Sequence, residues 1–341
     1  MARVFTDGAE MGDMSFWDVP GGGSAVIATP TPYESEWCYK LTGYGGTNSL
    51  KVISAVSEGY FRLRFLTHNN GPEYILGLMS TTGGNIIRLR MNNATNQWEA
   101  VVGASTVVAS SVIAGLVDTW YLLQIYVKID NAPNGRFVLY VDGNKLIDFT
   151  GDTQAAATTT FNYISCGHGG TGSWMALDDM AYNDTTGGVD ISYPQDGVIE
   201  KIIPIGDGAH NNWHGSDGDD IDNWDLVSEY PKDDDTTYVY HDSSATGTQD
   251  QYEMSDTWDD TNKIVTRVYA EARCRKTSAD SSKIKLGILP SGGVDQMSPA
   301  LDVYVNYYNR VVGSEYLVNP VDSSAWEKAD IDALEGIVEV A

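Results

Sequence analysis

The stretch from Asp118 to Phe149 constrains the fold of this chain more than any other. Apolar residues take every second position from Leu123 to Ile129, which is the pattern of a half-buried β-strand. Asn, Pro and Gly at 131–135 predict a turn, and a second alternating run follows at 137–141. Asp142-Gly143 then predicts a tight hairpin, because this pair tolerates the positive φ angles that such turns require. Strands joined in this way are typical of the middle of a β-sandwich.

Composition extends this expectation to the whole chain. Its 341 residues are enough for two domains, each with its own core. The 35 glycines, 20 tyrosines and 9 tryptophans favour an all-β protein over a helical one. The run Thr185-Thr186-Gly187-Gly188 predicts a linker. We therefore expect an all-β fold of two antiparallel β-sandwich (jelly-roll) domains, residues 1–188 and 189–341.

The formal net charge of −26 is spread unevenly along the chain. Residues 1–190 hold 18 acidic and 10 basic side chains, whereas residues 191–341 hold 29 acidic and 11 basic ones. Such a balance argues against binding to nucleic acid, which needs Lys and Arg to neutralise phosphates. It favours solubility, cation binding or docking on a basic protein surface.

Neither a leader peptide nor a membrane span is expected. The first ten residues lack the apolar run of a signal peptide. The most apolar window, Val107–Val117, is interrupted by two serines and a glycine, so no segment is expected to span a membrane. Cys38, Cys166 and Cys274 are too widely spaced for a disulfide framework or a metal motif, which favours a reducing compartment.

Residues 1–190 resemble a known fold family. Thr119-Trp120-Tyr121 opens a long strand, and GRFVLYVDGNKL follows. This combination resembles the core of the concanavalin A-like lectin/glucanase sandwich in its laminin-G-like form. The resemblance implies the fold of the first domain. It implies little about activity, since the same fold carries lectins, hydrolases and purely structural modules.

The same resemblance suggests a metal site. WMALDDMAYND at 174–184 resembles the final strand of laminin-G-like and carbohydrate-binding modules. In related modules, acidic residues near the N-terminus and the aspartates of that strand lie together and often hold a structural calcium ion. Carried over, the candidate ligands are Asp7, Glu10, Asp178 and Asp179, whose carboxylates supply the hard oxygens that calcium prefers. The alternative is that these acids only cap turns.

Two pairs of arginines each lie on one face of a predicted strand: Arg62 with Arg64, and Arg88 with Arg90. Side by side, the two pairs would form a basic stripe that docks an acidic partner or a glycan. The alternative is a solvated outer face with cross-strand charge pairs, which contribute little.

The second half contains a long polar loop without a complete metal motif. The five aspartates within 217–225 lack the Gly and Glu positions of an EF-hand. His210 and His214 have the spacing of zinc ligands on a helix, but the neighbouring Gly and Asn residues disfavour a helix. We expect a surface loop pinned by Trp213 and Trp224.

A second resemblance covers residues 195–341. It rests on a loop ending in YPKDDDTTYV, a predicted V-x-A-x-A-R hairpin within 263–289, and a closing W-x-x-ADIDALE segment. In this order they resemble a module of tailed-bacteriophage virion structural proteins. The opening MARVFTDGAEMGDMSFWDV also resembles the start of phage sandwich proteins.

No catalytic motif is recognisable. Glucanases of this fold space their carboxylates as Glu-x-Asp-x-x-Glu, and that spacing is absent from the chain. A nucleophile elbow, a zinc-protease motif and a phosphate loop are absent as well. The sequence therefore predicts no catalytic residues and a chain that is not an enzyme.

The resemblances imply a structural component of a bacteriophage virion, assembled in the host cytoplasm. The favoured role is a capsid decoration or auxiliary protein on the capsid exterior. Its partners would be the major capsid protein or other virion proteins, and the chain would be a homo-oligomer.

Two alternatives stay open. One is a glycan-binding tail-fibre or adhesin protein that recognises host surface glycans through Trp98, Trp174, Tyr44 or Tyr163, although a buried core position suits each tryptophan better. The other is a lyase or hydrolase without its recognisable motif.

Overall fold

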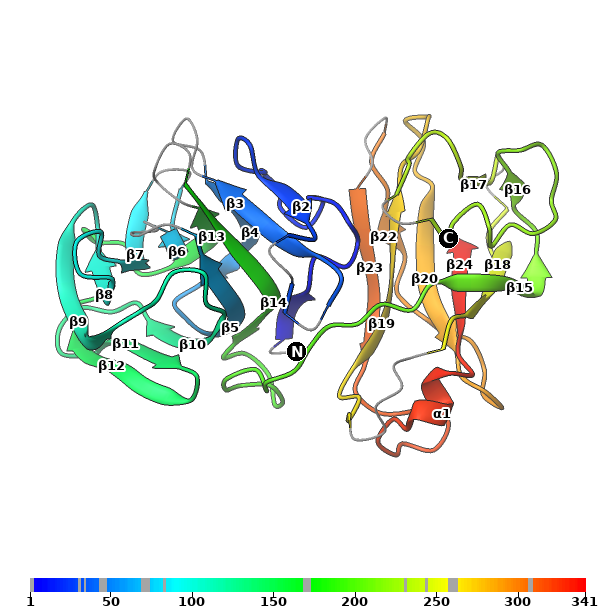
Figure 1. Cartoon of the computed structure of the whole chain (residues 1–341). Coiled ribbons are helices and arrows are strands. Elements are labelled where there is room, and N and C mark those ends of the chain that lie inside the picture. The colour runs from blue at the N-terminus through cyan, green and yellow to red at the C-terminus, as the bar shows by residue number, and fades with distance from the viewer. Residues whose placement is uncertain are drawn as a thin grey trace. The chain divides into compact units, whose positions relative to one another are not determined.

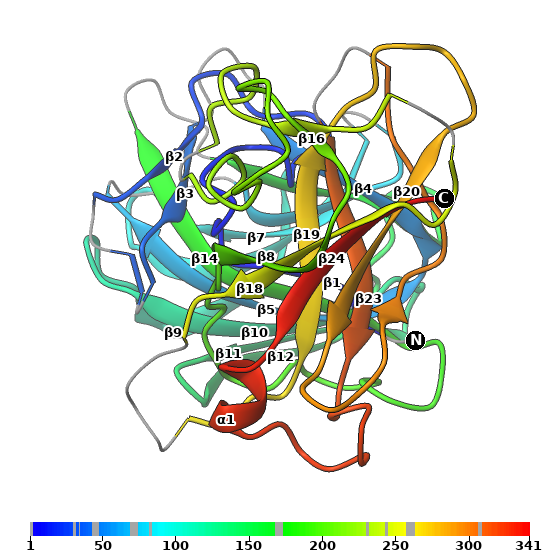
Figure 2. The ribbon, with the colours of Figure 1, turned by 90° about the vertical axis from the view of Figure 1, so that its right-hand side faces the viewer.

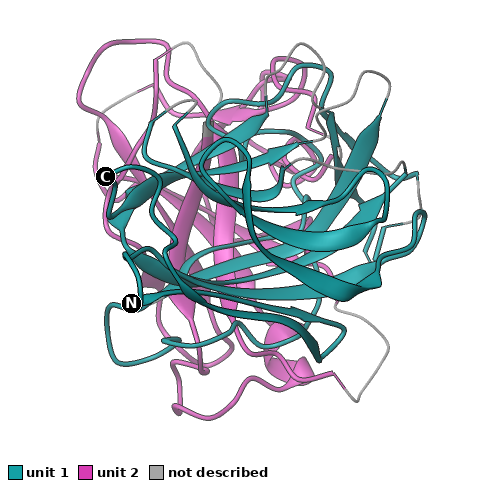
Figure 3. Cartoon of the chain, turned by 90° about the vertical axis from the view of Figure 1, so that its left-hand side faces the viewer, with its two compact units in different colours: residues 1–200 teal, residues 201–341 magenta. Residues whose placement is uncertain are grey.

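The computed structural model describes residues 3–29, 32–33, 35–42, 48–68, 74–81, 84–167, 173–229, 232–242, 245–256, 263–305 and 309–341. The chain divides into two compact units, Met1–Glu200 and Lys201–Ala341 (Figure 3). The division falls beyond the predicted linker at 185–188. Nearly all regular structure is antiparallel β-strand, so the prediction of an all-β sandwich fold is confirmed.

Unit 1 is a sandwich of two antiparallel sheets (Figure 1). The eight-stranded sheet contains, in spatial order, β12 (Asn144–Gly151), β11 (Gly135–Val141), β10 (Tyr121–Lys128), β5 (Glu58–Thr67), β14 (Trp174–Asp184), β3 (Cys38–Thr42) and β2 (Ala25–Ile27), with β1 (Arg3–Asp7) also paired to β14. The six-stranded sheet contains β4 (Ser49–Val56), β13 (Phe161–Gly167), β6 (Tyr74–Met79), β7 (Asn85–Met91), β8 (Gln97–Val102) and β9 (Thr106–Ala114).

The strands predicted within 118–149 are present as β10, β11 and β12, which are neighbours in the eight-stranded sheet. Asp142 and Gly143 have φ angles of 47° and 75°, as the predicted hairpin requires. Leu123 and Ile125 both lie in the core, because alternate residues of a strand face the same side.

The core of unit 1 lies between the two sheets. Both sheets contribute every second residue of their central strands, among them Phe61, Leu63, Phe65, Leu76, Leu78, Ile87, Leu89 and Trp98. Burying a large apolar side chain contributes about 1.5–3 kcal/mol. This core therefore fixes which face of each sheet points outward.

Residues 190–200, which we call the covering segment, lie across the outer face of the eight-stranded sheet. The Arg62 guanidinium donates from Nη1 to the Gln195 carbonyl oxygen at 2.6 Å. The Arg64 guanidinium pairs with the Asp196 carboxylate at 2.8 Å. This segment therefore belongs to the fold of unit 1, although the sequence places it after the glycine-rich run.

Unit 2 contains three further antiparallel sheets, and Figure 2 shows several of their strands side by side. The largest contains β15 (Pro204–Asn211), β18 (Gln249–Met254), β24 (Glu335–Val340), β20 (Lys283–Leu289) and β21 (Gln296–Met297), with β22 (Leu301–Asp302) paired to β20. The two-stranded sheets are β16 (His214–Gly215) with β17 (Val239–Tyr240), and β19 (Val268–Cys274) with β23 (Asn309–Tyr316).

The predicted hairpin at 263–289 is wrong. Its two strands, β19 and β20, lie in different sheets, where β19 pairs with β23 and β20 pairs with β24. Ala270 and Ile288 share one apolar cluster with Trp326, so the two strands pack face to face instead of edge to edge. The helix α1 (Lys328–Ile331) also contributes to this cluster. In the described part of the chain no helix is long and apolar enough to cross a membrane.

Candidate functional site: a polar face on the six-stranded sheet

The outer side of the six-stranded sheet carries a group of polar side chains on and beside β6, β7 and β8. We call it the polar face and define it as Tyr74, Asn85, Arg88, Arg90, Asn92 and Glu99. Leu89 points into the core, so the alternation of β7 directs Arg88 and Arg90 to the opposite side. The same argument applies to Glu99, which pairs in register with Arg90.

Arg88 is held in place at the centre of this face. Its Nη1 donates to the Gly103 carbonyl oxygen at 3.2 Å and its Nη2 donates to that of Ala104 at 2.8 Å. The guanidinium carbon lies 5.0 Å from the centroid of the Tyr74 ring, within the range of a cation–π contact. The Tyr74 hydroxyl accepts a hydrogen bond of 2.9 Å from the Asn85 amide. A phenol and a cation are thus fixed next to each other.

Gly77 makes this arrangement possible. It pairs in register with Arg88, and its neighbours Leu76 and Leu78 point into the core. A Cβ at position 77 would lie only 2.9 Å from Cδ1 of Tyr74. The Tyr74 ring therefore occupies space that any larger residue at this position would need.

Glu99 joins the remaining groups. Its two carboxylate oxygens accept hydrogen bonds from Arg90 Nε and Asn92 Nδ2, each at 2.9 Å. The Glu99 side chain is 7% exposed and that of Arg90 is 21% exposed, so solvent screens the pair only in part. The polar face thus combines two guanidinium groups, a phenol, a carboxylate and two amides, which suits a ligand bearing both hydroxyl and carboxylate groups.

The predicted basic stripe does not form, because the arginine pairs lie on different sheets. Arg62 and Arg64 belong to β5 of the eight-stranded sheet, where the covering segment leaves them 6% and 9% exposed. Arg88 and Arg90 belong to β7 of the six-stranded sheet. Only the second pair lies on the polar face, where Arg88 is 5% exposed, as buried as Arg62, and Arg90 is half-buried.

The four predicted calcium ligands do not converge. The Asp7 carboxylate accepts hydrogen bonds from the Tyr39 hydroxyl at 2.7 Å and from the backbone N–H of Ala9 at 2.9 Å. Glu10 follows β1 and is half-buried. Over the described ranges, no three Asp, Glu, His or Cys side chains are placed to hold a metal ion. No described group of ligands therefore forms the predicted clip, and Asp7 uses its carboxylate for hydrogen bonds within the protein.

Asp178 and Asp179 form a buried pair instead. Asp178 Oδ2 accepts hydrogen bonds from the Ser35 hydroxyl at 3.0 Å and from the Tyr33 N–H at 3.1 Å. Asp179 Oδ1 accepts one from the Ile199 N–H at 2.7 Å, which ties β14 to the covering segment. Burial raises the pKa of both carboxyl groups, and the neighbouring charge of Asp179 raises the pKa of Asp178 further.

The aromatic residues predicted to bind glycans are in different environments. Trp98 is 1% exposed and belongs to the core. Trp174 stacks on the ring of His68 with 4.8 Å between centroids. Tyr163 is half-buried in β13, and Tyr44 lies outside the described residues.

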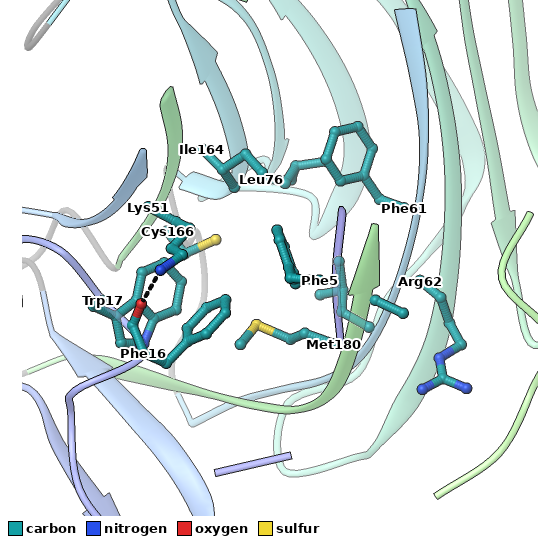
Figure 4. A pocket seen from close by; sticks show the side chains of 12 residues that line it. Phe5, Phe16, Trp17, Lys51, Phe61, Arg62, Leu76, Ile164, Cys166 and Met180 are labelled. Carbon is teal, nitrogen blue, oxygen red and sulfur yellow. Dashed lines mark hydrogen bonds between the residues drawn. The ribbon is translucent and has the colours of Figure 1, made fainter. Parts of the chain in front are cut away.

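A small cavity near one edge of the sandwich offers no ligand site. It measures about 20 Å³ and is lined largely by apolar side chains, including Phe5, Phe61 and Met180 (Figure 4). Lys51 at its side donates from Nζ to the Phe16 carbonyl oxygen at 2.8 Å. A space of this size has room for about one water molecule.

Sequence reasoning missed Tyr74, Asn85, Asn92 and Glu99 as site residues. The only local signal is the alternation of Trp98 with its neighbours, which directs Glu99 away from the core. Their grouping depends on the pairing of β6, β7 and β8, which the sequence does not specify locally.

Neither a family model nor a curated protein matches this chain. Solved structures with a similar fold include an endo-β-1,4-glucuronan lyase from Trichoderma reesei, at 13% identity over 54% of this chain and 96% of that one, with a TM-score of 0.41. The alginate lyase Aly36B matches at 15% identity over 54% and 97%, with a TM-score of 0.37. A Trypanosoma rangeli sialidase matches at 15% identity over 47% and 27%, with a TM-score of 0.34. The likeness is one of fold.

These comparisons contradict the prediction that the chain is not an enzyme, because the matching structures are polysaccharide lyases and sialidases. The prediction relied on the missing glucanase carboxylates. That spacing is specific to glucanases, and the same fold supports other enzyme reactions. Its absence therefore did not justify the prediction that the chain is not an enzyme.

Proposed function

We propose that this chain is a glycan-active protein whose polar face binds an acidic polysaccharide. The observation that carries the proposal is the fixed pair of Arg88 and Tyr74, with Asn85 holding the phenol and the Arg90–Glu99 pair beside it. A guanidinium group recognises a carboxylate with directed hydrogen bonds. Amide and carboxylate groups recognise sugar hydroxyls.

The same face has groups for acting on a bound chain. A guanidinium next to the carboxylate of a uronic acid stabilises negative charge that develops beside it. The Tyr74 hydroxyl, oriented by Asn85, is a candidate for proton transfer at the same sugar. Glucuronan and alginate, which are named in two of the matching structures, are suitable probes for both binding and cleavage.

The test uses the intact chain with alginate, glucuronan and a neutral polymer, and measures affinity by calorimetry and cleavage by the appearance of shorter chains. Tyr74→Phe keeps the ring and removes the hydroxyl, and should weaken binding about tenfold, as the loss of about 1.4 kcal/mol implies. Tyr163→Phe, on a neighbouring strand, is the matched control. The proposal fails if neither acidic polymer binds, or if both variants behave like the wild type.

The second candidate is a structural role in a tailed-bacteriophage virion, as a capsid decoration protein or a receptor-binding tail protein. It rests on the sequence resemblance of residues 195–341. An assembly role is favoured by the edge strand β9 and the turn after it, where Val112, Ile113 and Leu116 are 95%, 61% and 64% exposed. Exposed apolar patches and sheet edges are common interaction sites.

Co-sedimentation with capsids lacking the protein tests this second candidate. Saturable binding that Val112→Asp combined with Ile113→Asp abolishes would support docking on the major capsid protein through β9. A chain that stays in the supernatant would count against a capsid role.

A further inference from the structure

Figure 1 labels the small sheet of β16 and β17 in unit 2. A row of aromatic rings lies in and beside this sheet. We call it the aromatic row: Trp213, His214, Tyr238, Tyr240 and His241. Successive centroids are 6.1 Å apart from Tyr238 to Tyr240, 5.4 Å from Tyr240 to His214, 6.4 Å from His214 to His241, and 5.8 Å from His241 to Trp213. Each ring thus contacts the next, at interplanar angles of 58°, 48°, 15° and 54° in the same order.

One end of the row is anchored in unit 2. Trp213 is 9% exposed, and its indole N–H donates to the Thr248 carbonyl oxygen at 3.2 Å. Its backbone N–H donates at 2.7 Å to the carboxylate of Asp250, which is fully buried. The position of the row therefore does not depend on a ligand.

The other end faces solvent. Tyr238 and Tyr240 are 40% and 42% exposed; Tyr238 directly precedes β17, Tyr240 ends it, and their ring centroids are 6.1 Å apart. The backbone of Tyr238 is fixed by Ser216, which donates its N–H to the Tyr238 carbonyl oxygen at 2.9 Å. Exposed tyrosines on a fixed backbone provide flat apolar surface at little cost in side-chain entropy.

Acidic groups lie close to His214 of the row. The carboxylate of Asp220 is 2.8 Å from Nδ1 of His214, and this hydrogen bond raises the pKa of His214. The charge of Asp242 acts on His214 in the same direction. Residues 211–242 contain ten acidic side chains and one lysine. This charge repels uronates and sulfated sugars, and its carboxylates are hydrogen-bond acceptors for hydroxyl groups.

We propose that the aromatic row is a binding site for an uncharged glycan chain. The exposed rings of Tyr238 and Tyr240 would contact the apolar faces of consecutive sugars, and Asp220 and Asp242 would accept hydrogen bonds from their hydroxyl groups. Rings that contact one another in succession offer repeated apolar contacts, which suits a polymer of sugar rings. This site differs from the polar face in its residues, its unit and the charge of its ligand, so it does not depend on the proposed function.

The experiment measures affinity of the intact chain for a panel of neutral oligosaccharides, such as glucans, mannans and galactans, first on an array and then by calorimetry. Tyr240→Ala should weaken binding of the recognised glycan at least tenfold. Tyr304→Ala removes another exposed tyrosine of unit 2, 63% exposed and outside the row, and should leave affinity unchanged. Tyr238→Ala is the second test variant, because its backbone contacts to Ser216 survive the substitution.

Three results would overturn the inference. The wild-type chain could bind no neutral glycan on the panel. The row variants, correctly folded by circular dichroism, could bind as tightly as Tyr304→Ala. Tyr74→Phe could remove neutral-glycan binding, which would place the ligand on the polar face instead. Binding of acidic polymers is measured in the same variants, so a failure of this inference is distinguishable from a failure of the proposed function.

Discussion

At the scale of single residues, Gly77 determines the shape of the polar face. Tyr74 approaches the backbone of β6 because no side chain is present there, and this approach brings the phenol beside Arg88. A glycine in the interior of a strand weakens the strand, and it often marks a place where another group approaches the backbone closely. At Gly77 that group is the Tyr74 ring.

Gly77→Ala should therefore displace the Tyr74 ring. We expect the free energy of unfolding to fall by about 1–3 kcal/mol, which is the usual cost of overpacking. The affinity for acidic polymers should fall by more than it does in the Tyr163→Phe control. Urea denaturation and calorimetry measure the two effects. Gly188→Ala is the matched control, since a Cβ there meets no atom within 4 Å. Equal behaviour of both alanine variants would show that the close approach has no consequence.

The buried carboxyl pair predicts a pH dependence of stability. The folded chain keeps protons on Asp178 and Asp179 at pH values where the unfolded chain, with an aspartate pKa of about 3.9, has released them. Unfolding then releases protons, so stability falls as the pH rises from about 4 towards the raised pKa values, by up to about 1.4 kcal/mol per pH unit and group.

Asp178→Asn should flatten this slope, because asparagine does not ionise. The measurement is the free energy of unfolding in urea at about pH 5 and about pH 8. Asp152→Asn changes an exposed aspartate of the same unit and should keep the wild-type slope. A wild-type chain that gains stability over this range would contradict the assignment.

At the scale of elements, the covering segment completes the eight-stranded sheet. Besides its polar contacts to Arg62 and Arg64, it places the ring of Tyr193 against Tyr60 and Tyr140, at 5.1 and 5.6 Å between centroids. Removing it would leave these side chains and the Asp178–Asp179 pair exposed to water.

A fragment of residues 1–200 should consequently be more stable than a fragment of residues 1–188. Each lost hydrogen bond to a charged group contributes about 1.5–3 kcal/mol, so we expect a difference of at least about 3 kcal/mol. Chemical denaturation of the two fragments measures it. Coincident unfolding curves would mean that the segment lies on the sheet without stabilising it.

Some elements could be predicted because their signal is local. β10, β11 and β12 follow from alternation and from Asp142-Gly143, which need no information from elsewhere in the chain. β19 and β20 show the limit of this reasoning: each is a strand, but their partners, β23 and β24, lie far along the sequence. Strands that are neighbours in sequence often pair with each other. Here β19 and β20 belong to two different sheets, so each pairs with a strand from further along the chain.

The candidate site was predictable only in part for the same reason. Arg88 and Arg90 were identified as one face of a strand, but their partners Tyr74 and Glu99 come from adjacent strands. Arg62 and Arg64 were indistinguishable from them in sequence. The structure places the two pairs on different sheets, and the covering segment contacts Arg62 and Arg64 from more than 130 residues along the chain.

At the scale of the whole molecule, the excess of negative charge opposes folding. Unit 2 holds 27 acidic and 11 basic residues, and unit 1 holds 20 and 10. Since each unit has its own core, we expect two unfolding transitions. Added salt screens the repulsion and should raise both midpoints, that of unit 2 by more.

Scanning calorimetry at low and high sodium chloride measures both midpoints, and the isolated 1–200 fragment assigns the transition of unit 1. A larger salt effect on unit 1 would show that local ion pairs outweigh net charge in these units.

The covering segment also limits how such a chain can exchange its parts in evolution. The Thr-Thr-Gly-Gly run reads as a linker in the sequence. A crossover there would nevertheless replace the covering segment, which contacts Arg62 and Arg64, with residues from another protein. A crossover after Glu200 transfers the complete second unit and leaves the first intact. Natural chimaeras of this architecture should therefore join their halves after the covering segment, and alignments of mosaic relatives would show the breakpoint there.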